Sequence, residues 1–229
     1  MSGTSLPLLT RLGNYELVRL LAQGGMADIY LARQSGLDRL VAVKVLSSHR
    51  ANDAEAAALF MDEARLVGML AHANLAGVFE VAADEGVHYL AMEYVHGCDL
   101  RELLGAAHRQ RAAVPYEAAV AIAMAAASGL DHAHRRCGPD GRPLHLVHRD
   151  VPLSNIMVTH EGAVKVIDFG IAHIIRTALA ADPADRFASC AAMIDALERA
   201  CSLEGWDASA AALVPCLSTT LSTTATGGS

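Results

Sequence analysis

Long apolar runs, paired cysteines and an excess of positive charge are all missing from this sequence. Its longest apolar runs, Ala118–Ala127 and Ala208–Leu217, each reach about half of the ~20 residues that a membrane-spanning helix needs. Met1–Leu12 lacks a long apolar core, so we expect no targeting segment. The five cysteines form no Cys-x-x-Cys pair. This odd, unpaired set disfavours a disulfide framework or a zinc ribbon and favours a reducing, cytoplasmic location.

The charge balance and the apolar content exclude two further classes of protein. With 18 Lys and Arg against 25 Asp and Glu, the formal net charge is −7, which argues against a broad surface for nucleic acid or anionic membranes. The hydrophobic fraction of 53% is too high for a chain disordered throughout. A length of 229 residues is enough for one or two domains with a core. Aromatic residues make up only 4% and alanine is abundant, so burial per residue is modest.

Strand patterns dominate the first part of the chain. Apolar, β-branched runs predict five strands at Tyr15–Leu21, Ile29–Ala32, Leu40–Leu46, Val78–Val81 and His88–Tyr94. Ala54–Leu70 has apolar residues at helical spacing, with Glu63 near its middle. These elements predict a small N-terminal lobe that contains an antiparallel meander and one helix.

Helical patterns dominate the rest. We expect helices over Asp99–Gly105, Tyr116–Arg135 and Ala184–Ala200, the second directly after Pro115. Gly138–Pro143 is rich in turn residues, and two short strands, Ile156–Thr159 and Ala163–Ile167, follow it. Residues 218–229 have a low-complexity composition that predicts a disordered tail.

Two adjacent glycines and one lysine are the first candidates for chemistry. A strand–loop–strand around Gly24-Gly25 could wrap backbone N–H groups over phosphates, although an ordinary β-turn explains the glycines equally well. Lys44 lies in a strand built otherwise from Val, Ala and Leu, where a charge needs a partner unless it reaches solvent at an edge. Glu63 could be that partner, or could lie on a solvated helix face.

The strongest signal is the string His148-Arg149-Asp150-Val151-Pro152-Leu153-Ser154-Asn155, followed beyond a predicted hairpin by Asp168-Phe169-Gly170. Two aspartates and one asparagine offer an oxygen-ligand cluster that suits Mg²⁺ and a polar base. Agreement of both strings at this spacing by chance is very improbable.

With these strings, the chain resembles the protein kinase family, specifically the bacterial Ser/Thr kinases of eukaryotic type. Further matches run in the family's order from about residue 13 to about residue 173. They are the Gly-rich loop at Leu21–Ile29, Val41-Ala42-Val43-Lys44, Glu63, Leu70–Leu75 as L-x-H-x-N-I, and Leu90–Val95 as the last N-lobe strand and hinge. The resemblance implies an α+β, two-lobed protein kinase-like fold with a five-stranded antiparallel N-lobe and a helical C-lobe. We expect an N-terminal extension at 1–12, the N-lobe at 13–95, the C-lobe at 96–204 and a tail at 205–229.

The same resemblance implies a site for ATP and Mg²⁺. The adenine would lie between Leu21, Ile29, Ala42 and Met157, with Met92 as gatekeeper. The backbone of Glu93 and Val95 would bind the adenine edge, and Asp99 would reach the ribose. The loop residues Ala22, Gly24, Gly25 and Ala27 would cover the phosphates.

For catalysis, the resemblance implies that Lys44, held by Glu63, binds the α- and β-phosphates. Asn155 and Asp168 would hold Mg²⁺, and Asp150, with Arg149 beside it, would orient or deprotonate a protein Ser/Thr hydroxyl. The reaction would be transfer of the γ-phosphate, driven by positioning and charge neutralisation.

Three substitutions at two motifs depart from the family pattern. Ala22 and Ala27 occupy two of the three Gly positions of the loop, and alanine disfavours the positive-φ conformations that glycine allows. Pro152 stands where Ser/Thr kinases usually have Lys, and it offers no hydrogen-bond donor. We expect tolerable nucleotide binding and slower transfer.

A larger departure follows Gly170. Ile171–Thr177 runs almost directly into Ala181–Phe187, which resembles the late D-P-x-x-R segment of the family, and no A-P-E string occurs. Relative to the family pattern, much of the activation segment and of the central C-lobe helices is therefore missing. Exposing on the order of 400 Å² of apolar surface costs roughly 10 kcal/mol at ~25 cal/mol/Å², comparable with the ~5–15 kcal/mol stability of a domain. Such a C-lobe needs a partner or self-association to cover it.

Three alternatives stay open beside an active kinase. The first is a catalytically inactive ATP-binding pseudokinase, or a disrupted kinase fragment that acts as a binding module. The second is a small-molecule phosphotransferase, which the H-R-D string disfavours. The third is a zinc site among His132, His134, Cys137, His145 and His148, whose spacing matches no standard ligand set.

Overall fold

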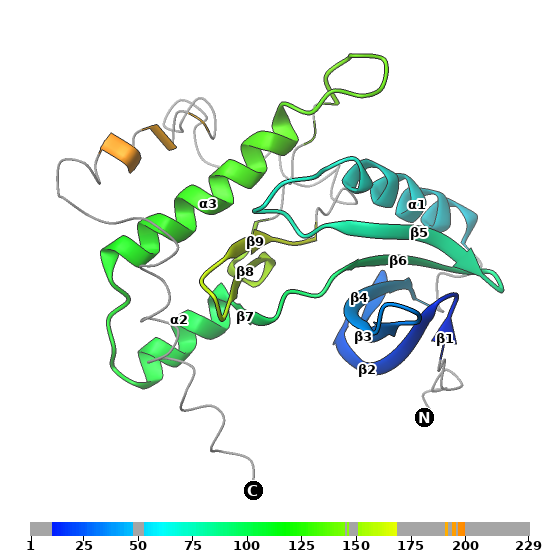
Figure 1. The fold of residues 1–229 in the computed structure, drawn as a ribbon, viewed down its shortest axis with the longest axis horizontal. Helices are drawn as coiled ribbons and strands as arrows, with labels where there is room; N and C mark the ends of the chain where they lie inside the picture. The colour runs from blue at the N-terminus through cyan, green and yellow to red at the C-terminus, as the bar shows by residue number, and fades with distance from the viewer. Residues whose placement is uncertain are drawn as a thin grey trace, which may run out of the picture. The chain divides into compact units, whose positions relative to one another are not determined.

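The computed structural model describes residues 11–47, 53–144, 146, 151–168, 191, 194–195 and 197–199. The chain divides into two compact units, one of residues 1–71 and 76–94 and one of residues 72–75 and 95–229. Figure 1 names the elements of both units.

The first unit is a curled antiparallel sheet with one helix. Its six strands are β1 (Arg11–Leu12), β2 (Tyr15–Gln23), β3 (Ala27–Gln34), β4 (Arg39–Leu46), β5 (Val78–Asp84) and β6 (Val87–Glu93), in the order β1-β2-β3-β4-β6-β5. All five predicted strands are present. The two-residue β1 joins them at the edge beside β2, through the register Leu12↔Tyr15.

Alternation along the strands builds two apolar clusters on this sheet. One contains Tyr15, Val41, Val43, Tyr89 and Ala91, with the Tyr15 and Tyr89 rings edge to face at 5.9 Å. The Tyr15 hydroxyl donates to Glu80 at 2.8 Å, and burial together with this carboxylate raises the pKa of Tyr15. The second cluster, which includes Phe60, Ala64 and Leu90, lies under helix α1.

Helix α1 (Ala54–Gly68) begins at Asp53, whose side chain accepts from the backbone N–H groups of Glu55 and Ala56. An aspartate at this position satisfies donors that the first turn leaves without intrahelical partners. The helix packs along β5 (Figure 1) and buries Ala56, Phe60, Glu63 and Ala64.

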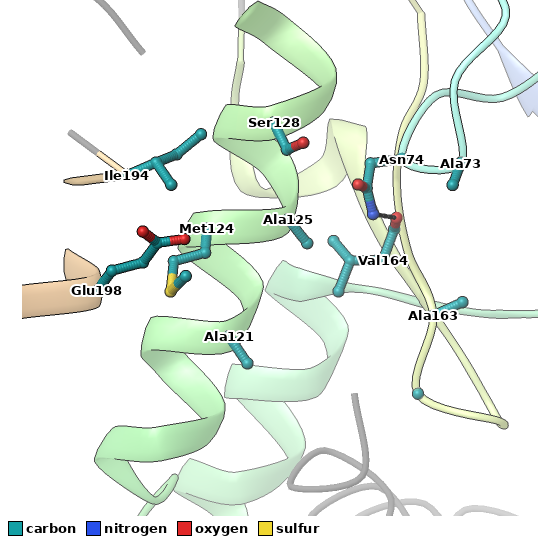
Figure 2. A pocket seen from close by; sticks show the side chains of 11 residues that line it. Ala73, Asn74, Ala121, Met124, Ala125, Ser128, Ala163, Val164, Ile194 and Glu198 are labelled. Carbon is teal, nitrogen blue, oxygen red and sulfur yellow. Dashed lines mark hydrogen bonds between the residues drawn. The ribbon is translucent and has the colours of Figure 1, made fainter. Parts of the chain in front are cut away.

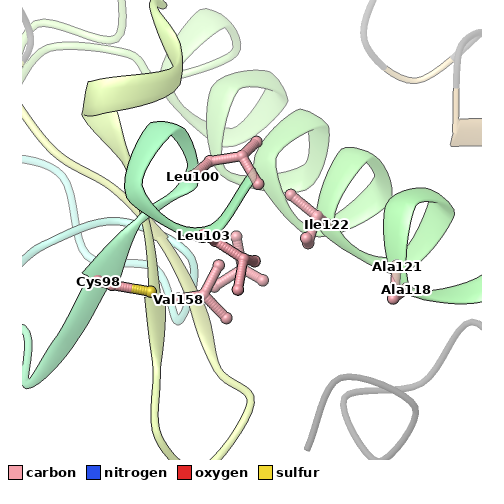
Figure 3. Packing of buried hydrophobic residues seen from close by; sticks show 8 residues of the cluster. Cys98, Leu100, Leu103, Ala118, Ala121, Ile122 and Val158 are labelled. Atoms are coloured by element: carbon pink, nitrogen blue, oxygen red, sulfur yellow. The ribbon is translucent and has the colours of Figure 1, made fainter. Parts of the chain in front are cut away.

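The second unit combines helices with a three-stranded sheet. Its elements are β7 (Gly97–Asp99), α2 (Leu100–Arg109), α3 (Tyr116–His134), the 3₁₀ turn η2 (Leu153–Asn155), β8 (Ile156–Thr159) and β9 (Val164–Val166). The sheet has the order β7-β8-β9 with antiparallel pairs. Figure 3 shows how Cys98, Leu103, Ile122 and Val158 pack where α2 and α3 meet this sheet.

Helix α2 is longer than predicted. The sequence predicts an end at Gly105, but the helix continues to Arg109 because Leu103, Ala106 and Ala107 are all buried. That burial outweighs the cost of about 1 kcal/mol that an interior glycine imposes. The prediction for Ala184–Ala200 falls largely outside the described residues, and its described positions, 191, 194–195 and 197–199, are helical.

Candidate functional site

Lys44 and Glu63 form an ion pair inside the first unit. Their Nζ and Oε1 atoms lie 3.5 Å apart, and the side chains are only 14% and 11% exposed. Lys44 belongs to the central strand β4, where it lies opposite Ile29 and Leu90. Glu63 is placed by α1, between the buried residues Phe60 and Ala64. The pairing predicted from sequence is therefore present, and the solvated reading of Glu63 is wrong.

The Gly-rich loop is shorter than predicted, because β2 continues through Ala22↔Ile29 and Gln23↔Asp28. None of Ala22, Gly24, Gly25 and Ala27 has a positive φ. Alanine at two of these positions therefore introduces no backbone strain in this conformation. A Cβ on Gly24 would lie 2.8 Å from the Ala27 carbonyl oxygen, so Gly24 is the loop position that needs glycine.

Two of the residues expected around adenine lie opposite each other on neighbouring strands. Ala42 of β4 faces Met92 of β6 in register and is buried. Met92 packs against a cluster that includes Phe60, Ala64 and Leu90, beneath α1. This position, between the sheet and the helix that carries Glu63, fits the predicted gatekeeper role.

Two hydrogen bonds to Gly77 fix the position of Glu93, the last residue of β6. Its backbone N–H donates to the Gly77 carbonyl at 2.7 Å, and its carboxylate accepts from the Gly77 N–H at 3.1 Å. These bonds engage the backbone N–H and one carboxylate oxygen of Glu93, so the predicted contact with the adenine edge does not use this N–H. Val95, two residues on, belongs to the second unit and is buried.

The predicted metal ligands Asn155 and Asp168 bracket the β8–β9 hairpin in the second unit. The Ile167 N–H donates to the Asn155 carbonyl at 2.9 Å. This bond holds Ile167, the residue before Asp168, against the last residue of η2. Asp168 has φ 53°, in the left-handed region that non-glycine residues seldom adopt. Such positions concentrate at functional sites, and this one begins the D-F-G string. Met157 lies between them on β8 and faces Asp99 and Lys165 in register.

Asp99 has a structural role as the N-cap of α2, which was not predicted from the sequence. Its carboxylate caps α2 by accepting from the Glu102 N–H at 2.7 Å, and its second oxygen lies 3.5 Å from the Arg101 guanidinium. An Asp three residues before a Glu is a capping signal that could have revealed this role. Arg149 and Asp150, together with Phe169 and Gly170, lie outside the described residues.

The segment His72–Leu75 belongs to the second unit, where it contacts β9 and α3. The Asn74 side chain donates to the Val164 carbonyl at 2.9 Å, and the Val166 N–H donates to the Asn74 carbonyl at 2.9 Å. The His72 ring stacks on His132 of α3, with centroids 5.0 Å apart. Burial, then the charges of His132 and Lys165, lower the pKa of His72. The L-x-H-x-N-I segment therefore acts here as a structural anchor.

A pocket of about 420 Å³ lies beside α3. Figure 2 shows Asn74 and Val164 on one side of the helix and Ile194 and Glu198 on the other. Of the residues in α3, only Tyr116 and Ala119 are exposed.

In the described part of the chain, no three His, Cys, Asp or Glu side chains are arranged to hold a metal. Within that same part, no helix is long and apolar enough to cross a membrane.

Comparison with known proteins agrees with this geometry. Residues 15–188 match the model of the protein kinase domain. The chain is 44% identical over 169 residues to "Tyrosine-protein kinase MasK" of Myxococcus xanthus, covering 72% of this chain and 26% of that protein. It is 36% identical over 163 residues to "Serine/threonine-protein kinase PrkC" of Bacillus subtilis, covering 70% and 23%. The chain thus spans about a quarter of the length of these relatives.

Among solved structures, the crystal structure of the Mycobacterium tuberculosis PknI kinase domain is similar, with a TM-score of 0.64 and 25% identity. The match covers 86% of this chain and 99% of that one. The two-lobed kinase-like fold predicted from sequence is confirmed. On these matches, the chain belongs to the protein kinase family.

Proposed function

We propose that this chain binds Mg·ATP and transfers the γ-phosphate to a protein Ser or Thr hydroxyl. The observation that carries the proposal is the buried pair of Lys44 and Glu63, 3.5 Å apart. A lysine held in this way presents a fixed positive charge, which suits the α- and β-phosphates of a nucleotide.

The residues present fit a magnesium–nucleotide complex. Asn155 and Asp168 provide the amide and carboxylate oxygens that Mg²⁺ prefers, and the Ile167–Asn155 bond holds the two ends of the hairpin together. Bound Mg²⁺ would neutralise charge that develops on the phosphates. Lys44 and Glu63 would orient the nucleotide, Ala42 and Met92 would enclose its base, and Asp150 would position the acceptor hydroxyl and take its proton.

Binding is tested by the shift in melting temperature that ATP with Mg²⁺ causes in the full chain. We expect stabilisation of the unmodified chain and its loss in both Lys44→Met and Asp168→Asn, because ligand binding to the folded state raises its apparent stability. Leu37→Asn is the matched control, since Leu37 is 66% exposed in the turn between β3 and β4. Equal stabilisation in all four proteins would contradict the proposed nucleotide site.

Transfer is tested separately with ATP labelled at the γ-phosphate and a general acceptor protein such as casein. We expect label on serine or threonine that Asp150→Ala removes. Label on tyrosine would change the proposed acceptor and leave the nucleotide site standing. Nucleotide binding with no transfer above the Asp150→Ala background would favour the pseudokinase, for which Pro152 and the short segment after Gly170 are the sequence reasons.

A further inference from the structure

Two histidines face each other at the open end of the small sheet in the second unit. Gly97 of β7 pairs with Thr159 of β8, so His96 and His160 are the next opposed positions of this antiparallel pair. The His160 N–H donates to the His96 carbonyl at 3.3 Å, which continues the ladder to these residues. Directly opposed residues on antiparallel strands have their Cβ atoms about 5 Å apart. The backbone therefore fixes the two side chains as neighbours.

The two rings have the separation that a shared ion requires. Their centroids lie 4.8 Å apart and their planes meet at 76°. Zinc–nitrogen bonds of about 2.0–2.1 Å place a ring centre about 3.2 Å from the metal, so two imidazoles at a tetrahedral angle have centres about 5 Å apart. Both side chains are exposed, so they are accessible to an ion from solvent and can rotate to aim one nitrogen each at a common point.

The charge around the pair also favours a cation. Glu161 follows His160 directly and is exposed in the β8–β9 turn. An exposed carboxyl group is ionised at neutral pH, so Glu161 places a negative charge beside His160.

We propose that His96 and His160 form a two-imidazole site for a transition-metal cation of the Zn²⁺ or Ni²⁺ class, with water completing the coordination. Imidazole nitrogens suit these ions, whereas Mg²⁺ prefers oxygen ligands. The site is thus separate from the expected magnesium position at Asn155 and Asp168. A bound ion joins the entry to β7 and the β8–β9 turn, and its existence does not depend on nucleotide binding or catalysis.

The test is titration of the full chain with Ni²⁺ at pH 7.5, followed by calorimetry. We expect one site whose affinity falls about tenfold or more in both His96→Gln and His160→Gln, because the second bond of a chelate forms at a high effective concentration. His108→Gln is the matched control, since His108 is an exposed histidine of α2. Equal affinity in the unmodified chain and either site variant would overturn the proposal, as would an equal loss in His108→Gln.

A second measurement uses the unmodified chain and so does not depend on how the variants fold. In ¹H–¹⁵N spectra, substoichiometric Ni²⁺ should broaden the amide signals of Gly97 and Glu161 first. Lowering the pH to 5.5 should reverse this broadening, because protons compete for the imidazole nitrogens. Broadening that begins elsewhere in the chain would overturn the proposal.

Discussion

Removing the charges of Lys44 and Glu63 singly and together should reveal how strongly this pair is coupled. Breaking a fully buried ion pair costs about 3–5 kcal/mol, whereas exposed pairs are worth about 0–1 kcal/mol. With side chains 14% and 11% exposed and a separation of 3.5 Å, this pair lies between these limits, near the buried one. We expect a coupling free energy of about 1–3 kcal/mol, within the range found for contacting residues.

The assay is urea unfolding followed by far-UV circular dichroism on four proteins: the unmodified chain, Lys44→Met, Glu63→Gln and the double variant. Each single change leaves one charge in a largely buried place without the opposite charge at 3.5 Å, so each destabilises the fold. The double variant removes both charges, so its loss of unfolding free energy should be smaller than the two single losses added together. Additivity within about 0.5 kcal/mol would mean that the two charges are not coupled in the folded chain.

An exposed ion pair in the same unit provides the matched control. Arg33 and Asp38 are closer, at 2.6 Å, but their side chains are 49% and 81% exposed. The corresponding cycle, Arg33→Met with Asp38→Asn, should give less than about 1 kcal/mol. If this pair couples as strongly as Lys44 with Glu63, burial is not the cause of the coupling.

Three further predictions concern stability. A Cβ on Gly97 would overlap the Val158 carbonyl oxygen, so Gly97→Ala should lower the melting temperature strongly, whereas Gly25→Ala, with open space around it, should leave it nearly unchanged. Asn74→Ala should cost about 1 kcal/mol in urea unfolding, because the Val164 carbonyl loses its side-chain donor; no loss would contradict the anchoring role. The lowered pKa of His72 means that the unfolded chain takes up this proton before the folded chain does. Its contribution to stability is therefore complete above about pH 6.5 and is lost as the pH falls through the depressed folded value. His72→Phe should flatten this acid dependence, and an unchanged slope would contradict it.

Long, strongly patterned elements could be predicted from the sequence. Leu40–Leu46 was found as β4 with one added residue, and Tyr116–Arg135 as α3 with one fewer, because their apolar periodicity continues over many residues. The strands β1 and β7 contain two and three residues, too few for any periodicity to appear, and exist only because partner strands pair with them.

Some features of the candidate site could likewise be predicted from the sequence, and others could not. Lys44 and Glu63 could be paired from sequence because a charge inside an apolar strand needs a partner. The resemblance to the kinase family singled out Glu63 among the acidic residues of the next helix. The capping role of Asp99 depends on a local contact with Glu102, one turn further on, and the Asp-x-x-Glu spacing could have revealed it. The anchoring role of Asn74 depends on a tertiary contact with Val164, far along the chain. The opposition of His96 and His160 follows from strand register, which no local pattern around either histidine reveals.

The most direct test of the central claim is transfer of labelled γ-phosphate from Mg·ATP to casein, measured with the unmodified chain and Asp150→Ala side by side. We expect label on serine or threonine that grows with time and falls to background in Asp150→Ala. Label at the same background level in both proteins, in samples whose melting temperature ATP and Mg²⁺ raise, would contradict kinase activity in this chain.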